Sequence, residues 1–127
     1  MRAAAALLLV ALPAAAQGPP WTDHLSDLMP ALRACLAGQQ GAMVVMAWPM
    51  NHGLALARLR QPYGARQDCV ADLGTGRVER RDPVPADSHM PGEGLRAFML
   101  ERRCVDAQRI DAPDGRELGW LAYQACG

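Results

Sequence analysis

The sequence predicts an α+β domain in which one N-terminal helix packs on an antiparallel meander of five or six strands, with two disulfides bracing the fold. Three observations support this fold class: an apolar stripe at helical spacing, a series of short strand-like runs separated by turn sequences, and four cysteines. The turns between the strand-like runs are too short to hold a crossover helix. We therefore expect antiparallel neighbours.

Residues 1–16 have the pattern of a secretory signal peptide. A positive start at Met1-Arg2 precedes an uninterrupted apolar run over 3–12, and alanines occupy the −3 and −1 positions of a cleavage site. The apolar run is too short to cross a bilayer. The sequence thus predicts one small secreted domain over 17–127, located in a bacterial periplasm or outside the cell, with no membrane insertion after cleavage.

The charge composition excludes several classes of partner. Thirteen Lys and Arg balance thirteen Asp and Glu, so the formal net charge is +0. No basic excess is available for nucleic acid or an anionic membrane surface. Every basic residue is arginine, which together with abundant Ala, Gly and Pro is typical of a GC-rich bacterial genome. We expect a monomer without a cofactor.

The helix is predicted near the start of the mature chain. If Asp27 is the N-cap, Pro30 falls at the third helical position, where a backbone N–H would lack a partner anyway. This places the helix at about residues 28–37, ended by Gly38, with 22–26 as a separate turn. The apolar stripe consists of Leu25, Leu28, Met29, Leu32, Cys35 and Leu36.

Four strands are predicted after the helix, separated by turns rich in Pro and Gly. Within the third strand, Cys69 and Ala71 should share one face, and Asp68, Val70 and Asp72 the other. In the second strand the alternation of Leu and Ala leaves the inward face open. The four runs are 43–48, 54–60, 66–72 and 77–82.

The C-terminal third is predicted to contain a loop and then a hairpin. Residues 83–94 hold three prolines and two glycines, which indicates a long loop and a candidate contact segment. Residues 95–105 fit either a helix or a strand, and we favour a strand. The turn sequence Pro113-Asp114-Gly115 leads into a final strand at 118–126.

The cysteines Cys35, Cys69, Cys104 and Cys126 predict two structural disulfides rather than a zinc or redox site, since no Cys-x-x-Cys spacing occurs. Four cysteines allow three connectivities. A three-residue loop at 114–116 would pair Pro113 with Glu117 and bring Cys104 opposite Cys126. Cys35 would then pair with Cys69.

A stretch of the chain resembles the PepSY domain. The ending Ala71-Asp72-Leu73-Gly74-Thr75-Gly76-Arg77-Val78 is similar to the Val-Asp-x-x-Thr-Gly-x-Val ending of that family, and the best local match runs over 55–80. The similarity covers about Asp23 to Asp82. The chain departs from the family in its four cysteines, in Pro30 and Pro49, and in the hairpin after Gly94. The resemblance implies a small exported binding module of the peptidase-inhibitory or regulatory kind, with no catalytic residue.

Catalytic motifs are missing from the sequence. Acid, hydroxyl and imidazole are neighbours only at Asp87-Ser88-His89, and adjacent residues of an extended loop point apart, so they cannot form a triad among themselves. We therefore predict a protein that is not an enzyme. A small hydrolase is retained as an alternative.

A second alternative is a periplasmic copper-binding or other metal-binding protein. Thioether and imidazole groups suit Cu(I), and Met50, His52, His89 and Met90 lie in predicted loops where they could converge. Met43 and Met46 are expected on opposite faces of a strand, and methionine is a common core filler. His24 is expected at the surface.

Few aromatic residues are available to build a core. Trp48, Trp120 and Tyr123 could form a binding surface, but we expect them in the core. Export, missing catalytic motifs and the PepSY-like stretch together predict a non-catalytic binding module for an envelope protein or peptide. Such a partner could add to a sheet edge or occupy a groove between helix and sheet.

Overall fold

The computed structural model describes residues 20–90 and 105–124. The predicted signal peptide, residues 91–94 of the predicted loop, all but the last residue of the predicted strand at 95–105, and both Cys104 and Cys126 lie outside these ranges. Within the described ranges, no helix is long and apolar enough to cross a membrane.

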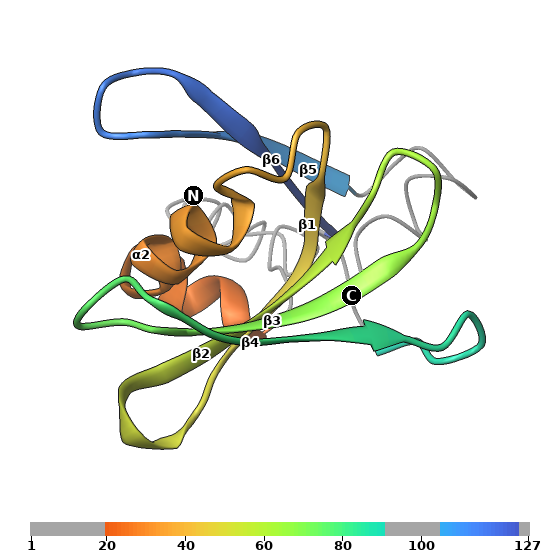
Figure 1. Ribbon diagram of the computed structural model, residues 1–127, viewed down its shortest axis with the longest axis horizontal. Coiled ribbons are helices and arrows are strands. Elements are labelled where there is room, and N and C mark those ends of the chain that lie inside the picture. The colour runs from red at the N-terminus through yellow and green to blue at the C-terminus, as the bar shows by residue number, and fades with distance from the viewer. Residues whose placement is uncertain (1–19, 91–104, 125–127) are drawn as a thin grey trace, which may run out of the picture.

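The described chain forms one helix packed on a six-stranded sheet, which confirms the α+β class (Figure 1). The sheet order is β4-β3-β2-β1-β6-β5. There are also two short 3-10 helices: η2 precedes α2, and η3 joins β1 to β2. The elements are η2 (Pro20–His24), α2 (Leu25–Leu36), β1 (Met43–Pro49), η3 (Asn51–Gly53), β2 (Leu54–Arg60), β3 (Arg66–Asp72), β4 (Val78–Val84), β5 (Val105–Asp111) and β6 (Glu117–Gln124).

The sheet is mixed, so the prediction of a purely antiparallel sheet is wrong at one junction. β1 and β6 run parallel and pair only through Met43 with Trp120 and Val44 with Leu121. The other four strand pairs are antiparallel. Short turns dictate antiparallel pairing only between strands that they join. β1 and β6 are distant in sequence, so no turn constrains their relative direction.

The apolar face of α2 packs on the small side chains of β2 and β3. Ala55, Ala57 and Ala71 are fully buried, and their small size lets the helix approach the sheet closely. The predicted disulfide between Cys35 and Cys69 is present, with an S–S distance of 2.06 Å. The faces of β3 are as predicted, and the alanines of β2 turn out to face the helix.

α2 begins earlier than predicted, at Leu25, so Asp27 lies in its first turn and Pro30 lies inside the helix. The predicted N-cap is therefore wrong. The reason is tertiary: η2 buries Trp21, which is 2% exposed and makes an edge-to-face contact with Tyr123 at a centroid distance of 5.4 Å. Burial of this large ring fixes the turn before the helix, so the helix starts without a side-chain cap. The free energy gained by this packing outweighs the loss of the one backbone hydrogen bond that proline cannot donate.

The β5–β6 hairpin has a different register from the predicted one. Its three-residue loop is 113–115, closed by the N–H of Ala112 donating to the carbonyl of Arg116 at 2.8 Å. Gly115 adopts a φ of 89°, as this loop type requires of its last residue. The predicted loop at 114–116 is wrong by one residue, and Val105 lies opposite Gln124, one residue away from the predicted register.

Candidate functional site

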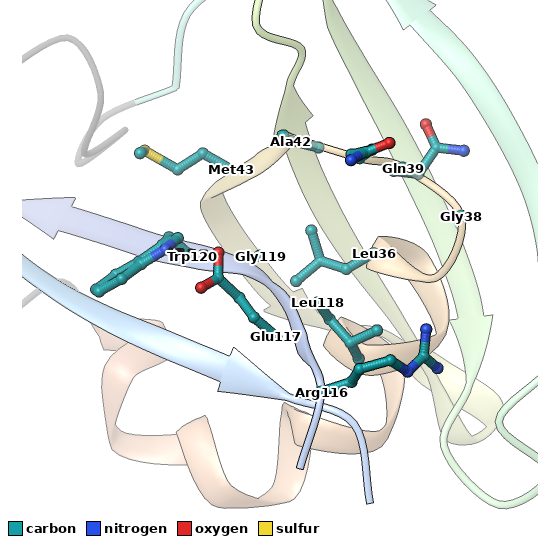
Figure 2. A pocket seen from close by; sticks show the side chains of 12 residues that line it. Leu36, Gly38, Gln39, Ala42, Met43, Arg116, Glu117, Leu118, Gly119 and Trp120 are labelled. Atoms are coloured by element: carbon teal, nitrogen blue, oxygen red, sulfur yellow. Dashed lines mark hydrogen bonds between the residues drawn. The ribbon is translucent and has the colours of Figure 1, made fainter. Parts of the chain in front are cut away.

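A cleft of about 500 Å³ opens between the α2–β1 connection and the start of β6 (Figure 2). Its volume is within the range of ligand sites in proteins. The two sides of the cleft are far apart in the sequence. The lining residues are Leu36, Gly38, Gln39, Gln40, Gly41, Ala42, Met43, Arg116, Glu117, Leu118, Gly119 and Trp120.

The cleft opens because the α2–β1 connection turns away from β6. Gly41 adopts a φ of 78°, and a Cβ atom there would lie 2.7 Å from Cγ of Pro62. The side chain of Gln61 donates a hydrogen bond to Oε1 of Gln39 at 2.9 Å. Both contacts hold the connection against the β2–β3 turn, on the side away from β6.

The cleft closes where β6 meets the start of β1. A Cβ atom on Gly119 would lie 2.8 Å from the carbonyl oxygen of Ala42 and 3.0 Å from Cδ2 of Leu36. Only glycine permits this approach without a shift of the backbone. Strand and connection are therefore in contact at Gly119 and diverge beyond it.

The floor of the cleft is apolar and one side of it is aromatic. Figure 2 shows Leu36 and Leu118 in the middle of the cleft, with Trp120 and the Glu117 carboxylate on one side. The indole N–H of Trp120 donates to Oε2 of Glu117 at 3.2 Å, which restrains the ring. Although its N–H is bonded, the Trp120 side chain is 40% exposed. An exposed indole beside an apolar floor is typical of a binding surface.

The charged groups of the cleft have partners within the β5–β6 hairpin. Nε of Arg116 lies 3.3 Å from Oδ2 of Asp114, and the backbone N–H of Arg116 lowers the pKa of that carboxyl. Nη1 of Arg109 lies 3.8 Å from Oε1 of Glu117. These pairs are exposed and contribute little to stability. Among the described residues, the lining contains no hydroxyl, thiol or imidazole, and its one carboxylate, that of Glu117, accepts the hydrogen bond from Trp120.

The structure does not bring the predicted copper ligands together. Met50 and His52 lie in the β1–β2 turn, whereas His89 and Met90 follow β4, which ends at the opposite end of the sheet. The described residues contain no group of three or more His, Cys, Asp or Glu that could hold a metal ion.

The structure also places the other methionines and the histidine that were considered as metal ligands. A bulge in β1 sets Met43 opposite Arg60 and Met46 opposite Arg58, so the two methionines share a face of the sheet and the prediction of opposite faces is wrong. His24 is exposed, as predicted.

The Asp87-Ser88-His89 sequence lies in an exposed turn in which the N–H of Ser88 donates to the carbonyl of Pro85 at 3.0 Å. β4 continues to Val84, two residues into the predicted loop. Residues 85–90, the rest of the described part of the predicted contact loop, do not line the cleft.

The expectation that the aromatics fill the core is wrong for two of them. Trp48 and Trp120 are 47% and 40% exposed, whereas Tyr123 is half-buried against Trp21. Trp21 provides the core aromatic instead. The sequence carried only faint signals of the cleft: the two glycines that flank Gln39-Gln40, and the Gly119-Trp120 pair far along the chain.

In comparisons with known proteins, no family model, no curated protein and no solved structure matched this chain.

Proposed function

We propose that this chain is an exported, non-catalytic binding module that acts on another protein of the cell envelope. The observation that carries this proposal is the cleft, where exposed Trp120 borders an apolar floor and the described lining residues include no hydroxyl, thiol or imidazole. The disulfide between Cys35 and Cys69 supports export, because such bonds persist in oxidising compartments. The signal-peptide pattern of residues 1–16 supports it independently.

The outer edges of the sheet are less suited to a partner than the cleft. β4 carries Pro83, which has no N–H to donate, and a pair of charged side chains, Arg80 and Asp82, joined at 2.6 Å. β5 exposes Arg109, which is bonded to Asp111. Proline and charged side chains are the usual protection of an edge strand against pairing with another chain.

The resemblance to PepSY domains favours regulation of a peptidase as the finer function. The resembling segment, about residues 23–82, includes the α2–β1 side of the cleft, and the β6 side lies beyond it. A partner seated in the cleft would therefore contact both a PepSY-like element and the hairpin particular to this chain.

Site-specific photocrosslinking tests the proposal in the organism that encodes the chain. Gln40, which is exposed and lines the cleft, is replaced by p-benzoylphenylalanine, and exposed Gln108 of β5 is replaced in the same way as the matched control. We expect position 40 to give a covalent adduct with one envelope protein, identified by mass spectrometry, and position 108 to give none. Equal labelling from both positions, or none from position 40, would contradict the proposal.

A further inference from the structure

In the part of the chain that the structure describes, no strand occupies one backbone edge at the start of β6. On one side β6 pairs with β5 along its length, but on the other side it meets β1 only at Trp120 and Leu121. Among the described residues, no backbone hydrogen bond joins Glu117 or Leu118 to the α2–β1 connection. This part of β6 therefore faces the cleft.

The position of a further strand is defined by the register of the sheet. Continued backward from Met43 opposite Trp120, that register would place Gly41 beside Leu118 and Gln40 beside Glu117. The chain instead leaves this path at Gly41 and turns toward Pro62. An extended segment from another chain can occupy the vacated path in line with β1.

The surroundings of this path favour a polypeptide over a carbohydrate. Backbone donors and acceptors at strand spacing are matched by another extended backbone, and strand addition of this kind takes its specificity from pockets for alternate side chains. The floor made by Leu36 and Leu118 provides such a pocket for one apolar side chain. Because Arg116 and Glu117 already have ionic partners, charge on the ligand is not the main determinant.

We propose that the cleft binds an extended segment of a partner polypeptide, which pairs its backbone with β6 at residues 117–118 and seats one apolar side chain over Leu36 and Leu118. This inference rests on the proposed function and specifies the chemistry of the partner. Because Leu121 faces the core and Trp120 the opposite face of β6, it assigns Trp120 contact with the next side chain of the segment, which points to that face.

The test begins with a phage-displayed library of random heptapeptides, selected against the full exported chain. The peptide recovered is synthesised with a single N-methyl group at each amide in turn, and Kd values are measured by titration calorimetry. Trp120→Ala removes the aromatic side of the cleft. Trp48→Ala is the matched control, since Trp48 is similarly exposed but lies five residues from Met43 along β1, about 16 Å away.

We expect N-methylation of a central amide to raise Kd by about tenfold, because one ladder hydrogen bond is lost and an acceptor loses its partner. Trp120→Ala should weaken binding to a similar extent, and Trp48→Ala should change it by less than about twofold. Circular dichroism would establish that both variants keep the wild-type fold.

Three results would overturn the inference: no peptide enriched above a parallel selection on Trp120→Ala, Kd values insensitive to N-methylation at every position, or Trp120-dependent binding of an N-acetylglucosamine oligomer but of no peptide. A crosslink from position 40 to an envelope protein in any of these cases would leave the proposed function standing. If position 40 also gave no crosslink, both the inference and the proposed function would be contradicted.

Discussion

Single residues with unusual backbone conformations fix the turns of this protein. In the β1–β2 turn, His52 has a φ of 63° and Gly53 a φ of 74°, and the turn is closed by the N–H of Met50 donating to the carbonyl of Leu54 at 2.8 Å. A left-handed conformation costs a residue with a Cβ atom about 1–2 kcal/mol. His52 therefore stores strain at the exposed tip of the hairpin.

Replacing this histidine should relieve the strain. We expect His52→Gly to raise the free energy of unfolding by up to about 1 kcal/mol, because the relief exceeds the entropy that glycine loses on folding. Asn51→Gly is the matched control: its φ is not positive, so the change should destabilise the protein by about 0.5–1 kcal/mol. Urea denaturation measures both. Changes of the same sign would contradict the strain argument.

The stability of the protein in acid should depend on the carboxylate of Asp72. Oδ1 of Asp72 accepts hydrogen bonds from the backbone N–H groups of Thr75 at 3.0 Å and Gly74 at 2.8 Å, and these bonds lower the pKa of the carboxyl from 3.8. A lowered folded pKa contributes stability above the unfolded value, and that contribution is lost as pH falls through the folded value.

We therefore expect Asp72→Asn to be less stable than wild type at pH 7, with the difference shrinking as pH falls below about 3.8. Thermal unfolding between pH 7 and pH 2 measures this. A difference that stays constant down to pH 2 would show that the carboxylate charge is not responsible.

At the scale of elements, α2 is attached to the sheet by covalent and polar contacts in addition to apolar packing. Cys35 is bonded to Cys69 of β3, and Nη2 of Arg81, on the neighbouring strand β4, donates to the Cys35 carbonyl at 3.2 Å. Burial lowers the pKa of Arg81. Since α2 packs on alanines, these contacts supplement a core of modest apolar volume.

Removal of the disulfide should lower the free energy of unfolding substantially. The bond closes a separation of 34 residues, for which the chain-entropy account gives about 3–4 kcal/mol. We expect the double variant Cys35→Ala, Cys69→Ala to lose stability of this order, measured by urea denaturation at pH 7. Wild type reduced with dithiothreitol should lose at least as much, because reduction also opens the predicted bond between Cys104 and Cys126. A loss below about 1 kcal/mol in both samples would show that helix packing alone holds α2 in place.

The described molecule consists of two parts joined along a short seam. The first is the meander β1–β4 with α2, and the second is the β5–β6 hairpin. They are joined by the two paired positions of β1 and β6, and by the packing of Ile110, Leu121 and Tyr123 against the core. In Figure 1 the hairpin diverges from the meander beyond this seam. The proposed cleft lies at one end of the seam.

Because few sheet contacts cross the seam, the hairpin should open more readily than the meander. We expect the amide of Leu121 in β6 to exchange with deuterium faster than the amides of Ala57 and Cys69 in the meander. Native-state hydrogen exchange followed by NMR measures this. Equal protection at all three amides would mean that the molecule opens as one cooperative unit.

The sequence by itself determined the elements whose signals are local. The bounds of β2 and β3 are as predicted, because alternation and turn residues act between near neighbours in the chain. The Cys35–Cys69 bridge was also predicted, although from a hairpin register that is wrong. The residues that determine these features lie close together or have only a few alternative partners.

Tertiary structure alone decided the features that depend on contacts between distant segments. The start of α2 depends on the burial of Trp21 against Tyr123, and the parallel β1–β6 pair depends on where the hairpin docks. The cleft exists because Gly41 turns toward Pro62 while Gly119 approaches Ala42. Turn and helix signals are encoded within a few residues, whereas the free energy of these long-range contacts becomes available only once the separate segments have packed together.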